Sequence, residues 1–98
     1  MPDSPRPRAD MHAETAQAIA LEALAFLAED RLRLQRFLDL TGLSVSDLRS
    51  DIAAPALNCA VLEHLAADES LLLVFTASRA IAPQSIAPAI ALLRAASP

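Results

Sequence analysis

Hydrophobic side chains recur with the period of an α-helix from about residue 13 onward. In residues 13–28 they form one stripe, with polar side chains largely outside it, which is the pattern of an amphipathic helix packed on a core. The stripe consists of Ile19, Ala20, Ala23, Phe26 and Leu27. Similar patterns predict helices over about residues 31–41, 45–50 and 55–67, another from residue 69, and a last one over 83–94. The sequence therefore predicts an all-α protein, a compact bundle of about six helices.

Residues that favour helix ends stand at these predicted boundaries. Asp30 and Asp68 each precede a helix, where a carboxylate accepts hydrogen bonds from the free N–H groups of the first turn. Ser44 followed by Asp47 is typical of a capping box. Gly42 is the only glycine and follows the second helix, where a left-handed cap is expected.

The last two predicted helices have unusual compositions. Residues 71–75 form an unbroken apolar run, and because a helix that is apolar on all sides is usually buried, we expect this helix at the centre of the core. Pro83 is placed to begin the last helix. Pro88 would remove a hydrogen bond and kink that helix unless the helix effectively begins near Ser85.

The two halves of the chain resemble each other when one is shifted by 38 residues. Each half then reads as a long helix, an Asp-capped helix, a tight connection and a shorter third helix. We predict two pseudo-repeated three-helix units that share one core, with chance agreement in a Leu- and Ala-rich chain as the alternative. The matched pairs are Leu24 and Leu62, Leu27 and Leu65, Ala28 and Ala66, Asp30 and Asp68, Leu34 and Leu72, Phe37 and Phe75, Leu43 and Ile81, and Leu48 and Ile86.

Length and composition limit the organisation of the chain. With 98 residues it is expected to form a single helical domain over 13–94, between a disordered N-terminal tail (1–12) and a C-terminal tail (95–98). Hydrophobic residues make up 54% of the chain, which predicts apolar surface left for a partner to cover. No apolar run approaches the ~20 residues that span a bilayer, so no membrane association is expected. A single cysteine suits a reducing compartment, and we expect a cytoplasmic protein.

The charge balance disfavours nucleic acid as a partner. The net charge is −4, all eight basic residues are arginines, and the chain lacks Trp and Tyr for base stacking. The one cationic cluster is Arg31, Arg33 and Arg36. We expect it to be a solvated helix face with Glu29–Arg33 and Arg36–Asp39 ion pairs. A docking face for an acidic partner is the alternative.

No combination of residues points to catalysis, a cofactor or a metal. Cys59 and His64 point about 140° apart on one helix, so neither a zinc site nor a nucleophile–base pair is expected from them. We interpret Cys59 as a small buried residue facing Glu63, and His64 as a residue whose protonated ring would favour the helix C-terminus. The adjacent acid pairs, residues 29–30 and 68–69, are explained by helix capping.

Residues 37–49 present the helix, glycine turn and second helix of a helix-turn-helix DNA reader. The second helix would, however, bring Asp47 and Asp51 toward the phosphates beside a single Arg49. A capped helical corner that packs Leu43 and Leu48 explains the same residues, and we prefer that interpretation.

Three segments, residues 25–30, 36–43 and 68–75, together resemble a family of small proteobacterial, mainly alphaproteobacterial, helical proteins known as a domain of unknown function. The resemblance covers about residues 13–93. It implies a helical fold in a bacterial cytoplasm, without an assigned activity, substrate or catalytic residue. The chain departs from the family pattern at Ala80, where a glycine like Gly42 is expected, and at Pro88, which leaves the geometry of the last helix open.

We therefore expect a non-enzymatic helical protein–protein interaction module or small adaptor, acting on a protein partner or as a homodimer. The expected contact surfaces are the outer sides of residues 19–26 and 86–93, because the terminal helices of a repeat pair have one uncovered side. The alternatives are a helix-turn-helix-like nucleic-acid-associated regulator, which would use the Gly42 turn and the arginine face, and an enzyme that uses Cys59 or His64. The sequence identifies no small-molecule ligand.

Overall fold

A computed structural model describes residues 11–97 and confirms an all-α bundle. The predicted N-terminal tail (1–12) therefore lies almost entirely outside the described residues. The elements are α1 (Ala13–Ala28), α2 (Arg31–Thr41), α3 (Val45–Ser50), α4 (Pro55–Ala66), α5 (Glu69–Ser78), a 3₁₀ turn η1 (Pro83–Ser85) and α6 (Ile86–Ala96). The last helix thus ends two residues beyond the predicted Arg94.

The predicted caps form as expected. Asp30 accepts hydrogen bonds from the N–H groups of Leu32 and Arg33, and Asp68 accepts one from Leu71. Ser44 and Asp47 form the reciprocal capping box of α3. These side chains satisfy backbone groups that the first turn of a helix leaves free. Helices α2, α3 and α5 therefore start where their caps predict.

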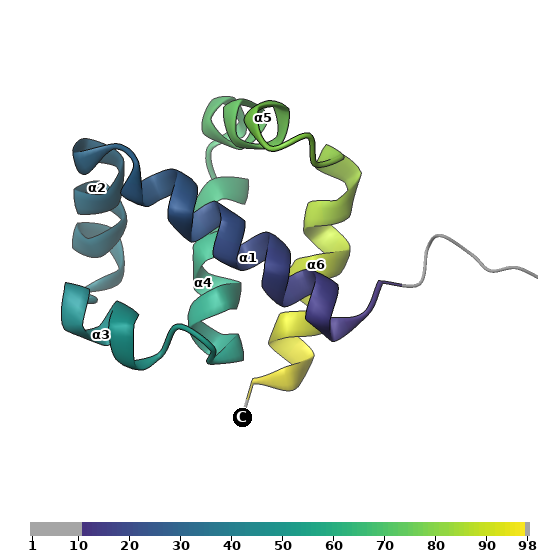
Figure 1. Ribbon diagram of the computed structural model, residues 1–98, viewed down its shortest axis with the longest axis horizontal. Helices are drawn as coiled ribbons and strands as arrows, with labels where there is room; N and C mark the ends of the chain where they lie inside the picture. Colours follow the sequence, from purple (N-terminus) through teal and green to yellow (C-terminus); the bar gives the residue numbers. More distant parts are fainter. Residues whose placement is uncertain (1–10, 98) are drawn as a thin grey trace, which may run out of the picture.

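The core lies where α1, α4 and α6 pack against one another, with α1 crossing in front of the other two (Figure 1). Helix α1 contributes seven buried residues and α4 six. Helices α2 and α5 each pack against the helix that precedes them, and α3 lies at the periphery beside α2 (Figure 1). The long helices, rather than the apolar fifth helix, therefore form the centre of the molecule.

The 38-residue repeat is visible in the structure. Phe37 and Phe75 are both fully buried, and so are Leu27 and Leu65. Asp30 and Asp68 have the same capping role. The third elements differ, because α3 has six residues at the periphery whereas α6 has eleven and packs into the core. With 11 residues, α6 is shorter than the first helix of its unit, α4 (12 residues), but longer than the second, α5 (10 residues).

Pro88 does not kink the last helix. Pro83 begins the 3₁₀ turn, and α6 starts only at Ile86, so Pro88 is its third residue. A proline is tolerated in the first turn because the N–H groups there have no carbonyl partner within the helix. The helix begins next to Ser85, which is the condition under which the sequence predicts no kink at Pro88.

The expected central position of α5 is wrong. Only Phe75 and Thr76 are buried in this helix, while the side chains of Leu73 and Val74 are each 49% exposed. One side of α5 packs on the bundle and the other does not. The second apolar face of α5 is consequently left at the surface.

The contact surfaces expected on the terminal helices offer little large apolar area. Most apolar side chains of residues 19–26 and 86–93 are buried, because α1 and α6 pack against each other and against α4. Leu21, at 37% exposure, is the one large apolar side chain of these segments that reaches the surface substantially. The terminal helices form the core and leave the outer face to other elements.

Candidate interaction surface

Cys59 is buried on α4, as predicted, with its Sγ 3.9 Å from the carbonyl oxygen of Ile90. Burial raises the pKa of the thiol, and nearby Glu63 raises it further, against a smaller opposite effect of Arg94. A raised pKa keeps the sulfur protonated, and the thiolate is the reactive form. The surroundings of Cys59 therefore disfavour a role as nucleophile.

The surroundings of His64 oppose the protonated ring that would favour the helix C-terminus. Its ring packs edge-on against Phe37, with centroids 5.2 Å apart. Burial lowers the pKa of His64, and Arg36 lowers it further, while Asp68 acts in the opposite direction. Burial and the cation together outweigh the carboxylate that would favour the charged ring.

The arginine face of α2 forms different ion pairs from those predicted. Arg33 pairs with Asp30 at 3.8 Å and lies 4.5 Å above the ring centroid of Phe26. Asp39 accepts a hydrogen bond from Gln35 instead of pairing with Arg36. Glu29, the expected partner of Arg33, pairs instead with Arg79 at the end of α5. Arg36 lies at the exposed surface.

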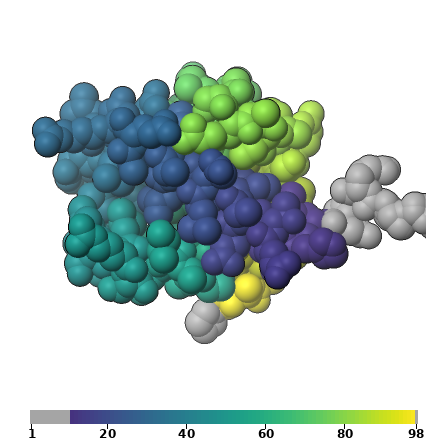
Figure 2. Space-filling model, viewed as in Figure 1, coloured from purple at the N-terminus to yellow at the C-terminus, as the bar shows by residue number. Residues whose placement is uncertain are grey.

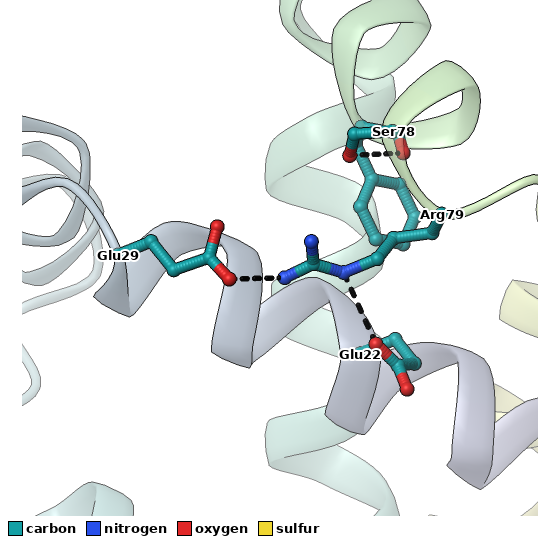
Figure 3. Close-up of polar contacts among 5 residues, drawn as sticks. Glu22, Glu29, Ser78 and Arg79 are labelled. Carbon is teal, nitrogen blue, oxygen red and sulfur yellow. Dashed lines mark hydrogen bonds and ion pairs between the residues drawn. The ribbon is translucent and has the colours of Figure 1, made fainter.

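Arg79, at the end of α5, joins this helix to α1 (Figure 3). Its Nε donates to Glu22 at 3.1 Å and its Nη2 donates to Glu29 at 2.8 Å. These hydrogen bonds raise the pKa of Arg79 above its ordinary value, and the bond to Glu29 has the largest effect. Sequence analysis missed this contact because the two glutamates lie 57 and 50 residues from Arg79 in the chain, and no local pattern links them.

Two surface hollows flank α5. One has a volume of about 530 Å³ and lies between α1 and the turn after α5, and its charged lining residues, Glu22 and Arg79, bind each other. The other, of about 370 Å³, lies between α2 and the start of α5 and is lined by Arg36, His64 and Asp68 among others. Within residues 11–97 no group of three or more His, Cys, Asp or Glu side chains is placed to hold a metal ion.

The outer face of α5 is an uncharged surface with apolar side chains. Ser70, Leu73, Val74 and Ala77 are all exposed, and their spacing places them on one stripe of the helix. No charged residue occurs between Glu69 and Arg79. Helix α5 stands at the upper edge of the molecule in Figure 2. We call these four residues the α5 stripe.

The repeat supplies an internal comparison for the α5 stripe. The equivalent residues of α2 are Leu32, Gln35, Arg36 and Asp39, which are exposed as well. Three of these four are polar or charged, as is usual for a helix face in water. A second helix of this fold therefore does not require an apolar outer face, and the apolar α5 stripe needs an explanation other than folding.

The corner at residues 37–49, for which DNA reading was the alternative, has the geometry of a capped turn. Gly42 adopts φ of 77° and its N–H donates to Leu38 at 2.8 Å. The helix that would enter a groove, α3, has only six residues. The carboxylate of Asp47 accepts from the N–H of Ser44, so that it caps the helix.

Comparison with known families decides the membership of this chain. A model of a protein family described as a protein of unknown function, DUF3572, matches residues 13–96. The chain belongs to the DUF3572 family. No curated protein and no solved structure shows significant similarity to it.

The match to DUF3572 extends from the first residue of α1 to the last residue of α6. It confirms the resemblance to a domain of unknown function. The α5 stripe lies within this DUF3572 domain. No single helix of the domain is long and apolar enough to cross a membrane. Helix α5 and the segment 83–96, which meet at a bend of 111°, are together long and apolar enough.

Proposed function

We propose that this DUF3572 domain is a non-catalytic protein–protein interaction module of the bacterial cytoplasm, and that the α5 stripe is its contact surface. The observation that carries the proposal is the uncharged, half-exposed face of Leu73 and Val74 on a helix whose other side is already packed. Apolar surface of this kind is stabilised when another protein covers it, because water is released from both faces.

The non-catalytic part of the proposal is supported by the two residues suited to chemistry. The thiol of Cys59 is buried with a raised pKa, and His64 lies on the same helix without contacting it. A nucleophile needs an activating base within hydrogen-bond distance. The alternative, binding of duplex DNA through Arg49, has less support because α3 offers six residues and two neighbouring carboxylates.

Affinity capture tests the proposal. Tagged wild-type protein and the variant Leu73→Gln/Val74→Arg, which takes the residues of the equivalent α2 positions, are used as baits in a native bacterial lysate. The control bait is Gln35→Ala/Arg36→Ala, altered at those same positions of α2. Circular dichroism checks that all three baits are folded.

We expect the wild type and the control to retain the same chain in equal amount, and the α5 variant to lose most of it, by about tenfold or more. A loss of this size corresponds to roughly 1.4 kcal/mol. Equal capture by all three baits would show that the α5 stripe is not the contact surface, and the proposal would be wrong.

A further inference from the structure

The α5 stripe is symmetric in the size of its side chains. From its N-terminal to its C-terminal end it reads small, large, large, small: Ser70, Leu73, Val74, Ala77. A contact between two identical chains about a twofold axis must be complementary to itself. An antiparallel pair of α5 helices with its axis between positions 73 and 74 meets this condition, because each large side chain faces the other large one and each small side chain faces a small one.

On this basis we propose that the α5 stripe binds a second copy of this chain, with the two α5 helices antiparallel. This inference rests on the proposed function and names its partner. In this arrangement Leu73 of one copy packs against Val74 of the other, and Ser70 packs against Ala77. The small residues at both ends allow the helix backbones to approach closely.

The absence of charge permits contact through this face. Each copy has a net charge of −4, so two copies repel each other in most orientations. The uncharged α5 stripe is a place where they approach without bringing like charges together. Antiparallel order also places the positive N-terminal end of each α5 dipole beside the negative C-terminal end of the other.

The size of the contact predicts weak association. Helix α5 has 10 residues and is therefore about 15 Å long. One helix pair of that length buries much less than the roughly 1,200–2,000 Å² typical of stable complexes. We expect a reversible dimer with a dissociation constant on the order of 10–100 μM.

Sedimentation equilibrium of the whole chain tests this inference. Between about 10 μM and 1 mM, a range chosen to bracket the expected constant, the average mass should rise from 10.4 kDa toward twice that value. Val74→Arg should remain at 10.4 kDa throughout. The control Gln35→Arg, which adds the same charge on the equivalent stripe of α2, should associate like the wild type.

Disulfide trapping tests the orientation. Chains with Ser70→Cys and chains with Ala77→Cys, each also carrying Cys59→Ala, are mixed and oxidised. The antiparallel arrangement predicts that mixed dimers exceed both homodimers severalfold. Predominance of Ser70→Cys homodimers would mean parallel helices and would overturn the arrangement.

The two proposals fail separately. A wild-type chain that stays at 10.4 kDa at about 1 mM would refute self-association. If the lysate experiment then shows a different chain whose capture depends on Leu73 and Val74, the interaction module remains and its partner is another protein. If no capture depends on these residues either, both proposals are wrong.

Discussion

Gly42 and Ala80 occupy equivalent positions of the two units, and both adopt the left-handed backbone conformation, with φ of 77° and 55°. Glycine enters this region freely, whereas a residue with a Cβ is strained there by roughly 1–2 kcal/mol. The family pattern predicts a glycine at the position of Ala80. The structure gives the physical reason, since the second unit turns as the first does but with a less suitable residue.

Ala80→Gly is expected to stabilise the protein by about 0.5–1 kcal/mol, because relief of the strain exceeds the greater freedom of glycine in the unfolded chain. The measurement is the urea midpoint. The reciprocal variant Gly42→Ala should destabilise by about 1 kcal/mol through the backbone alone, since no atom lies within 4 Å of an added Cβ. Opposite signs for the two variants are required; a destabilised Ala80→Gly would contradict the argument.

His64 predicts a pH dependence of stability. Its pKa in the folded protein lies below the usual 6.5, so the unfolded chain binds the proton more readily. The contribution of His64 is therefore fully favourable above pH 6.5 and decreases as the pH falls through 6.5 toward the lowered value. Urea unfolding from pH 8 to pH 5 should show a smaller acid-induced loss for His64→Gln than for the wild type. Identical slopes would mean that the ring is as easily protonated in the fold as outside it.

At the scale of elements, α4 packs against both α1 and α6, and six of its residues are buried. It contains Asn58, which is 1% exposed and whose Nδ2 has no hydrogen-bond partner among residues 11–97. The equivalent residue of α1 is Ala20, which is fully buried. The two units thus place a polar and an apolar side chain at the same position of their long helices.

Asn58→Leu is expected to raise the free energy of unfolding by about 1 kcal/mol, because it replaces an unpaired buried amide with an apolar side chain of similar size. Chemical denaturation measures the change. Asn58→Ala serves as the comparison and should gain less, since it leaves a cavity. A lower stability of the leucine variant would show that the amide is hydrogen-bonded in solution.

At the scale of the whole molecule, the sequence predicted the elements better than their positions. Caps such as Asp30, Ser44 and Asp68 act within a few residues, so local reading located the helix boundaries. The repeat followed from apolar residues that each unit needs for its own packing. The position of α5 and the ion pairs of Arg79 depend on which helices meet, and periodicity carries no information about that.

The contact surface illustrates the same limit. The apolar run of residues 71–75 was visible in the sequence, but burial in the core and exposure for a partner give the same composition. Only the packing of Phe75 against Phe26, at 5.4 Å between ring centroids, distinguishes the inner side of α5 from the outer one. The comparison between α2 and α5 could have raised the question earlier, since it requires only the repeat.

The place of α6 in the core determines when this protein can fold during its synthesis. Helices α1 and α4 both pack against α6, so the core is incomplete until residue 96 has been made. Ribosomes add roughly 5–20 residues per second, and the first helix therefore waits several seconds for its last neighbour. During that interval its apolar stripe is exposed to chaperones and proteases. Although the sequence consists of two similar units, the protein folds as a single unit, after both have been translated.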